Sequence, residues 1–301
     1  MQDLSPCSIC HSSKRRVVFS STLGATDRWF DGFDPYSGHY QINKCEGCGL
    51  LYSSPIFDDG DIQSLYRGYE ETNVTPGELP NVSRTMAGYF RLAAADLYNR
   101  QRMLDVGCDI GLLLEVARND GFKELYGLEP VAVAKADAVK RLPDANISEF
   151  FYEDGLFEKD FFDLISLIHV VDHLVRPERT LSVVWKQLKP GGICLAVVHN
   201  SESLLAKLLG ERFPVFNFFH HYFFTKRTLR KLFESCGFEP IRVVATMNCY
   251  SLSFFLERLP FLSIGFRRNL AKIADRVLIG RLPLSIPIGN IAIVARKPNT
   301  P

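Results

Sequence analysis

The stretch Met103-Leu-Asp-Val-Gly-Cys-Asp-Ile-Gly111 decides the fold of this chain. Its apolar first half predicts a short buried strand that ends in a glycine turn. A helix over residues 112–119 follows directly, and a second strand over residues 125–128 ends at Glu129. Glycines in such a turn let the backbone approach a ligand closely, and an acidic strand tip can accept both hydroxyls of a ribose. The segment therefore predicts an α/β nucleotide-binding unit.

Three segments together resemble the class I S-adenosylmethionine (SAM) methyltransferases. Residues 104–111 are similar to their motif I, D-x-G-x-G-x-G, and residues 162–173 to their fourth strand and its exit. Residues 188–199 are similar to the turn and fifth strand. The resemblance implies a Rossmann-like seven-stranded mixed sheet with helices on both faces, and SAM as the cofactor.

Carried over residue by residue, the resemblance also assigns a cofactor site. Asp105 would lie near the methionine moiety, Gly107 and Gly111 would open the pocket, and Glu129 would bind the ribose. His169, at the end of the fourth strand, would lie against the cofactor or between cofactor and substrate. For the adenine amino group the sequence leaves two candidates open, Glu153 and Asp154.

Asp109 departs from the family pattern, since it occupies the place of the second glycine. Aspartate tolerates positive φ better than most residues, so the turn can keep its shape. Its carboxylate could pair with the ammonium of SAM or repel the carboxylate of SAM. The turn supplies neither the G-x-G-x-x-G of dinucleotide enzymes nor the Gly-Lys-Ser/Thr of a P-loop. A Rossmann-like domain that has lost its ligand remains an alternative.

The N-terminal cysteines form two C-x-x-C pairs, Cys7 with Cys10 and Cys45 with Cys48. Four thiolates in this spacing can surround Zn²⁺ tetrahedrally, and a site closed by four protein ligands is structural rather than catalytic. Two unrelated pairs of reduced thiols are one alternative. A redox C-x-x-C is another, but it needs a βαβ context that this region lacks. The spacing favours a zinc ribbon.

An oxygen acceptor must lose its proton during methyl transfer, and histidine is the usual base near neutral pH. The segment Phe216-Asn-Phe-Phe-His-His-Tyr-Phe-Phe-Thr225 resembles a histidine-containing segment of sugar methyltransferases, which makes His220 the counterpart of their catalytic histidine. Phe219 stands where a glutamate often precedes it. The catalytic candidates are therefore His220 and His169. Alternatively, His220 and His221 pack or cap a helix that begins near Thr225.

Composition places the chain among ordinary globular proteins. It has 301 residues, 47% of them hydrophobic and 23% charged, with a net charge of +1. This balance argues against a nucleic-acid partner, because Lys14-Arg15-Arg16 is the only basic cluster of the predicted ribbon. Paired reduced cysteines and the lack of a signal-like start favour the cytoplasm. The predicted divisions are a zinc ribbon (1–59), a helical bridge (60–102), a SAM-binding core (103–249), an apolar insert (250–288) and a final strand with tail (289–301).

The insert at residues 250–288 alternates apolar side chains, among them Phe261 and Leu262, with cations such as Arg267 and Arg268. An apolar face edged by cations favours a helix at a membrane interface, so a peripheral position at the inner membrane face or a lipid-linked substrate is expected. A dimer contact or a lid over the pocket remains open as an alternative.

The predicted function is methyl transfer from SAM to a small-molecule or glycan-linked acceptor. The resemblance to sugar methyltransferases favours oxygen-directed transfer to a sugar that is nucleotide-, lipid- or polysaccharide-linked. One alternative is a non-catalytic scaffold with a SAM fold. The other is a nucleic-acid methyltransferase that uses the ribbon as a reader.

Overall fold

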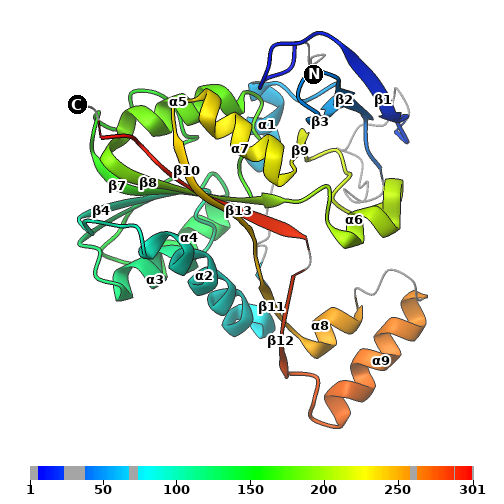
Figure 1. The fold of residues 1–301 in the computed structure, drawn as a ribbon. Helices are drawn as coiled ribbons and strands as arrows, with labels where there is room; N and C mark the ends of the chain where they lie inside the picture. Colours follow the sequence, from blue (N-terminus) through cyan, green and yellow to red (C-terminus); the bar gives the residue numbers. More distant parts are fainter. Residues whose placement is uncertain (1–5, 24–37, 68–73, 258–262, 288, 300–301) are drawn as a thin grey trace.

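The computed structural model describes residues 6–23, 38–67, 74–257, 263–287 and 289–299. Seven strands form its central sheet, in the order β10-β13-β8-β7-β4-β5-β6 (Figure 1). The strands from β8 to β6 run parallel, whereas β13 is antiparallel to both β8 and β10. Their bounds are β4 (Arg102–Val106), β5 (Glu124–Leu128), β6 (Asn146–Ser148), β7 (Phe162–Ile168), β8 (Leu188–His199), β10 (Glu239–Ala245) and β13 (Asn290–Arg296). The predicted seven-stranded mixed sheet is confirmed.

Helices cover both faces of this sheet (Figure 1). One face carries α2 (Leu79–Ala94), α3 (Leu112–Asn119) and α4 (Ala132–Arg141), and the other carries α5 (Pro177–Gln187) and α7 (Lys226–Ser235). The inward side chains of the sheet are almost fully buried between them, because parallel strands covered on both faces contact no water. The ligand-binding edge is therefore the one where β4, β5, β7 and β8 end.

The cysteine-rich region forms a second, four-stranded sheet in the order β1-β2-β3-β9. Three of its strands come from the N-terminus: β1 (Arg15–Phe19), β2 (Gln41–Cys45) and β3 (Leu51–Ser54). The fourth, β9 (Tyr222–Phe223), comes from the segment between β8 and α7. Tyr52 of this sheet and Leu50, just before β3, share one hydrophobic core with side chains of the central sheet. The ribbon is thus packed onto the central sheet.

Four shorter elements connect these layers. Helix α1 (Asp59–Arg67) and the 3-10 helix Pro76–Glu78 lie between the ribbon and α2. Helix α6 (Leu204–Leu209) and the 3-10 helix Gly210–Arg212 lie between β8 and β9. Ser203 caps α6 by accepting a hydrogen bond from the backbone amide of Ala206 (3.1 Å), which fixes where the chain turns after β8.

The predicted insert forms an arm between β10 and β13 that points away from the central sheet (Figure 1). Two antiparallel strands, β11 (Asn248–Ser251) and β12 (Pro283–Ile286), carry α8 (Leu252–Glu257) and α9 (Ile264–Arg276). The arm leaves large apolar side chains exposed: Phe266, Ile273, Val277, Leu278, Ile279 and Leu282. Residues 258–262 and 288 of the insert, with the predicted Phe261 and Leu262, lie outside the described residues. Among the described helices, none has the length and apolar composition needed to cross a membrane.

Candidate active site and zinc cluster

The glycine turn after β4 has the strained backbone that its sequence predicts. Gly107, Asp109 and Gly111 have φ angles of 70°, 46° and 80°. A Cβ at Gly107 would lie 3.0 Å from Val170 Cγ2, and one at Gly111 would lie 3.3 Å from Ala138 Cβ. Glycine is therefore required at both positions, whereas Asp109 accepts the left-handed conformation at a cost of about 1–2 kcal/mol.

Glu129, at the tip of β5, binds this turn through both carboxylate oxygens. Its Oε2 accepts a hydrogen bond from the Asp109 amide (2.8 Å), and its Oε1 accepts one from the Val131 amide (2.8 Å). Each carboxylate oxygen can accept a second hydrogen bond, so the side chain can still receive two hydroxyl donors. Two neighbouring ribose hydroxyls are donors of this kind.

Asp105, Asp109 and Glu129 form what we call the carboxylate cluster. Asp105 is buried and accepts a hydrogen bond from Ser166 Oγ (2.6 Å). Burial, opposed by this hydrogen bond and reinforced by the charges of Glu129 and Asp109, raises the pKa of Asp105 to about 8. Burial also raises the pKa values of Asp109 and Glu129. Asp109 Oδ1 is buried without a hydrogen-bond partner. Three crowded carboxylates and an orphaned acceptor fit the positively charged sulfonium and ammonium of SAM.

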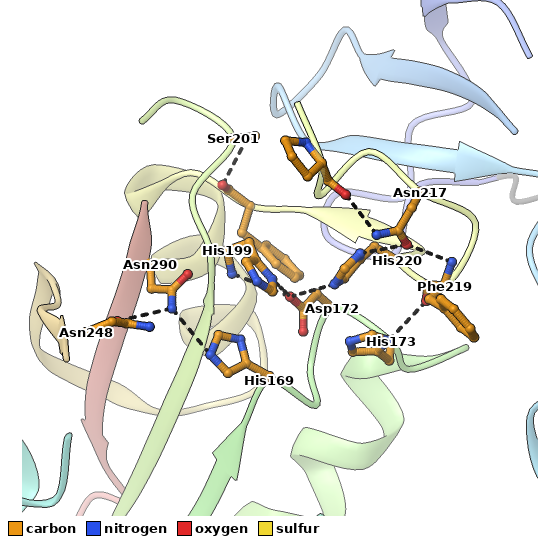
Figure 2. A network of polar contacts seen from close by, with 12 residues as sticks. His169, Asp172, His173, His199, Ser201, Asn217, Phe219, His220, Asn248 and Asn290 are labelled. Atoms are coloured by element: carbon orange, nitrogen blue, oxygen red, sulfur yellow. Dashed lines mark hydrogen bonds and ion pairs between the residues drawn. The ribbon is translucent and has the colours of Figure 1, made fainter. Parts of the chain in front are cut away.

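Across the same edge of the sheet lies what we call the imidazole cluster: His169, Asp172, His173, His199 and His220. The loop after β7 supplies the first three, the end of β8 supplies His199, and the segment before β9 supplies His220. Figure 2 shows the Asp172 carboxylate in the middle of the four rings. Ring centroids are 4.6 Å apart for His169 and His199, and 4.9 Å apart for His199 and His220.

Asp172 organises this cluster. Its Oδ2 accepts a hydrogen bond from His199 Nδ1 (2.9 Å) and lies 4.0 Å from His220 Nε2. Burial alone would raise the pKa of Asp172, but the hydrogen bond from His199 holds that pKa well below its usual range. Asp172 is therefore ionised and fixes the proton of His199 on Nδ1, so that Nε2 of His199 carries a free lone pair.

His169 lies at the exit of β7, as the sequence predicts, with a φ of 54°. Asn290 Nδ2 lies 3.4 Å from His169 Nε2, while Nδ1 is buried without a partner. Burial and the neighbouring His199 lower the pKa of His169 to about 3. The ring is neutral at physiological pH and links the cluster to β13. Its predicted contact with the cofactor stays a prediction.

His220 lies inside the cluster, with its Nδ1 3.0 Å from Asn217 Oδ1. Only 7% of the residue is exposed, and burial holds its pKa well below the usual range. The cap of α7 is Thr225, whose hydroxyl accepts a hydrogen bond from the Thr228 amide (3.1 Å). His220 is therefore not the helix cap that the alternative interpretation allows.

The four-stranded N-terminal sheet, called the ribbon, holds the segment that carries His220. The Ser53 amide donates to the His221 carbonyl (2.8 Å), and Tyr52 of β3 pairs with Tyr222 of β9. The Asp172 carbonyl in turn accepts hydrogen bonds from the amides of His221 (2.9 Å) and Tyr222 (3.2 Å). The segment is thus fixed from both sides, and the ribbon takes part in placing the imidazole cluster.

The four predicted metal ligands come together in the ribbon. The Sγ atoms of Cys7 and Cys48 are 3.6 Å apart, and those of Cys10 and Cys45 are 3.4 Å apart. All four Sγ atoms lie within 4.8 Å of one another. Four sulfurs at about 2.3 Å from a tetrahedral Zn²⁺ would be roughly 3.8 Å apart. The donor set therefore fits a structural zinc ion, which would clamp the chain before β1 to the turn after β2.

The pairing of His199 with Asp172 is the feature that the sequence did not predict. Asp172 follows β7 and His199 is the last residue of β8, and the ends of these two parallel neighbours meet at one edge of the sheet. That rule places His199 and Asp172 in the same region but does not specify a hydrogen bond between them. Of the two candidates for the adenine amino group, Asp154 has its carboxylate bound to Lys186 Nζ (2.9 Å) at the surface.

The fold and this edge of the sheet define a SAM-dependent methyltransferase of class I. Residues 81–243 match the family described as "Methyltransferase domain", which is more than half of the chain. The chain belongs to this family.

Among curated proteins, the chain is similar to several described as "Ubiquinone biosynthesis O-methyltransferase". The protein from Dinoroseobacter shibae is 26% identical over 181 residues, 56% of this chain and 73% of the relative. The protein from Cronobacter sakazakii is 25% identical over 148 residues, 46% of this chain and 60% of the relative. The latter match therefore spans less than two thirds of that relative.

Two solved structures show the same fold. One is a complex between the Haloferax volcanii Trm112 methyltransferase activator and a methyltransferase (TM-score 0.53, 15% identity, covering 75% of this chain and 95% of that chain). The other is a methyltransferase from Bacillus halodurans C-125 (TM-score 0.51, 18% identity, covering 71% and 99%). At these identities the similarity concerns the fold alone.

Proposed function

We propose that the chain transfers the methyl group of SAM to a hydroxyl oxygen of a small molecule, with a sugar or glycan-linked hydroxyl as the first acceptor class. The observation that carries the proposal is the hydrogen bond between His199 Nδ1 and Asp172 Oδ2 (2.9 Å). It lies at the same sheet edge as the carboxylate cluster. An oriented imidazole beside a cofactor site is what removal of a hydroxyl proton requires.

The carboxylate cluster would hold the cofactor. Bound SAM supplies an electrophilic methyl group on a positively charged sulfur. Glu129 has free acceptor capacity for the ribose hydroxyls, and Asp105 and Asp109 provide carboxyl oxygens for the methionine end. Gly107 and Gly111 let the backbone approach the cofactor without a Cβ in the way. Methyl transfer needs alignment of acceptor, methyl and sulfur more than any further chemistry.

His199 is the base that the geometry favours. Its side chain is 25% exposed, so it can meet an acceptor, and Asp172 behind it stabilises the imidazolium that forms. His220, the candidate from the sequence, is more deeply buried, and its Nδ1 is engaged by Asn217. We therefore place His199 as the proton acceptor and His220 beside it.

The acceptor class rests on two similarities and one surface. The segment 216–225 resembles sugar methyltransferases, and the curated relatives are named O-methyltransferases, which supports oxygen as the acceptor atom. The exposed apolar side chains of α9, such as Phe266 and Ile273, favour an acceptor carried on a lipid. The net charge of +1 does not favour a nucleic acid.

The test measures SAM consumption with a panel of nucleotide-linked sugars, glycolipids in vesicles, and catechols. Turnover with a sugar acceptor that falls by about 10²-fold or more in His199→Gln, at unchanged SAM affinity, is the expected result. His221→Gln is the control for loss of a nearby imidazole, because His221 points its Nδ1 at the Leu174 carbonyl (3.3 Å) and not at Asp172. Turnover with catechols alone would overturn the sugar assignment. Absence of SAM binding in folded protein would favour the scaffold alternative.

A further inference from the structure

We propose that Asp172, His173 and His220 form a second metal site, which takes one divalent first-row transition-metal ion at the acceptor side of the active site. One carboxylate and two imidazoles are a recognised donor set for such ions, and they leave coordination positions open. In the part of the chain that the structure describes, this trio is one of three groups whose ligand atoms lie within 4.8 Å of one another.

The spacing of the three ligand atoms suits one ion. Imidazole nitrogens and carboxylate oxygens bind such a metal at about 2.1 Å, so ligands on opposite sides of it are roughly 4.2 Å apart. The three candidate ligand atoms lie within 4.8 Å of one another, a spacing compatible with one shared ion. The rings of His173 and His220 already lie beside each other, with centroids 4.4 Å apart.

The tautomers of both histidines are set for metal binding. His173 Nδ1 is 3.1 Å from the Phe219 carbonyl oxygen, and His220 Nδ1 is 3.0 Å from Asn217 Oδ1. Both partners are oxygen acceptors, so each Nδ1 carries the proton and each Nε2 keeps its lone pair. Metal-bound histidines almost always donate their other ring N–H to an oxygen in this way.

The orientation of the Asn217 amide is itself fixed by two further hydrogen bonds. Its Nδ2 donates to the Pro214 carbonyl (3.0 Å), and its Oδ1 accepts from the Phe219 amide (3.0 Å). The oxygen therefore faces His220, as Figure 2 shows. A hydrogen-bonded support of this kind behind a ligand is what holds a metal site in shape before the ion arrives.

The carboxylate provides the strongest indication of a missing partner. Asp172 is 1% exposed, and its Oδ1 has no hydrogen-bond partner, while Oδ2 is taken by His199. An unpaired buried carboxylate oxygen costs free energy, which a cation would offset.

His169, Asp172 and His199 form the neighbouring trio, but the His199 nitrogen nearest Asp172 is already used in the hydrogen bond. An ion bound by Asp172, His173 and His220 would leave the hydrogen bond between His199 and Asp172 intact. An ion there would leave positions for an acceptor hydroxyl and lower its pKa next to His199 Nε2. This catalytic role rests on the proposed function, whereas metal binding itself does not.

Imidazole and carboxylate donors suit Mn²⁺, Fe²⁺, Co²⁺ or Zn²⁺, whereas the thiolates of the ribbon select zinc. The experiment therefore loads the full chain with one equivalent of zinc and titrates it with Co²⁺. We expect one further equivalent to bind, with a visible spectrum that lacks a thiolate charge-transfer band. His173→Gln and His220→Gln should each weaken this uptake by about tenfold or more, whereas His221→Gln should not.

The outcomes separate this inference from the proposed function. Any of three results would overturn the metal site. No second equivalent of Co²⁺ binds, or the spectrum has only thiolate character. The third is that folded, SAM-binding His173→Gln and His220→Gln proteins take up as much Co²⁺ as the wild type. Metal uptake is measured without turnover, so a chain that binds Co²⁺ but transfers no methyl group keeps the inference. If the chain transfers methyl groups but binds no second metal, the proposed function stands and the metal site is overturned.

Discussion

The carboxylate cluster and the imidazole cluster lie at the same edge of one sheet, yet they are built differently. The first comes from residues 105–129, a single strand, turn, helix and strand unit. The second brings together the ends of β7 and β8 and a segment that pairs with the N-terminal ribbon. The cofactor side is thus a local property of the chain. The acceptor side depends on contacts between distant segments.

The largest expected effect separates the two clusters by chemistry. Asp172→Asn should lower turnover by roughly 10²–10⁴-fold, because the amide no longer fixes the tautomer of His199 or stabilises its positive charge. SAM affinity should stay unchanged, since no hydrogen bond among the described residues joins the Asp172 side chain to the carboxylate cluster. Single-turnover rates and calorimetric SAM titration measure the two quantities. An equal loss in both would show that the clusters are not independent.

The second prediction tests whether the ribbon supports the imidazole cluster but not the carboxylate cluster. Cys45→Ser should weaken zinc binding by the four-cysteine cluster, loosen β3 and withdraw support from the segment that holds His220. A misplacement of about 1 Å there can lower turnover by ~10²-fold. SAM affinity should be retained. Metal analysis, turnover and SAM titration check this, with Cys249→Ser in the arm as the control for loss of a thiol.

The third prediction contrasts the pH dependence of stability. His169 has its pKa lowered to about 3 by burial, so below pH 6.5 the unfolded chain takes up a proton that the folded chain does not. The free energy of unfolding of the wild type, relative to His169→Gln, should therefore fall by about 3 kcal/mol between pH 6.5 and 4. Urea denaturation at both pH values measures it.

The pH dependence of stability that Asp105 contributes should have the opposite sign to that of His169. The Asp105 pKa of about 8 means that the folded chain keeps a proton that the unfolded chain releases near pH 4. Wild-type stability relative to Asp105→Asn should fall as pH rises from about 4 to 8. The same sign for both variants would contradict the contrast between the clusters.

The smallest expected effect concerns the cofactor alone. Glu129→Ala should weaken SAM binding by about 1–3 kcal/mol, because the ribose hydroxyls lose their acceptor and the Asp109 amide loses its partner. Turnover at saturating SAM should change little. Calorimetric titration with SAM and with its demethylated product checks the affinity. A larger effect on turnover than on affinity would place Glu129 in the transfer step instead.

The sequence was sufficient for features whose physical cause is local. The glycine turn, the helix at Leu112–Asn119 and the cysteine pairs all follow from short-range rules, and the structure has them where they were expected. The hydrogen bond between Asp172 and His199 and the fourth strand of the ribbon were not predicted. Both join segments far apart in the chain, and Tyr222–Phe223 is too short to show a strand pattern.

The pairing of β3 with β9 also sets an order for folding during synthesis. The four cysteines are available once residue 48 has left the ribosome, so the four-cysteine cluster can come together early. Its fourth strand arrives only with residues 222–223, after five of the seven strands of the central sheet have been made. Contacts of such long sequence separation form late because loop closure precedes them. The edge of β3 therefore stays unpaired for most of translation, and the nascent chain must keep that edge from pairing elsewhere until β9 is made.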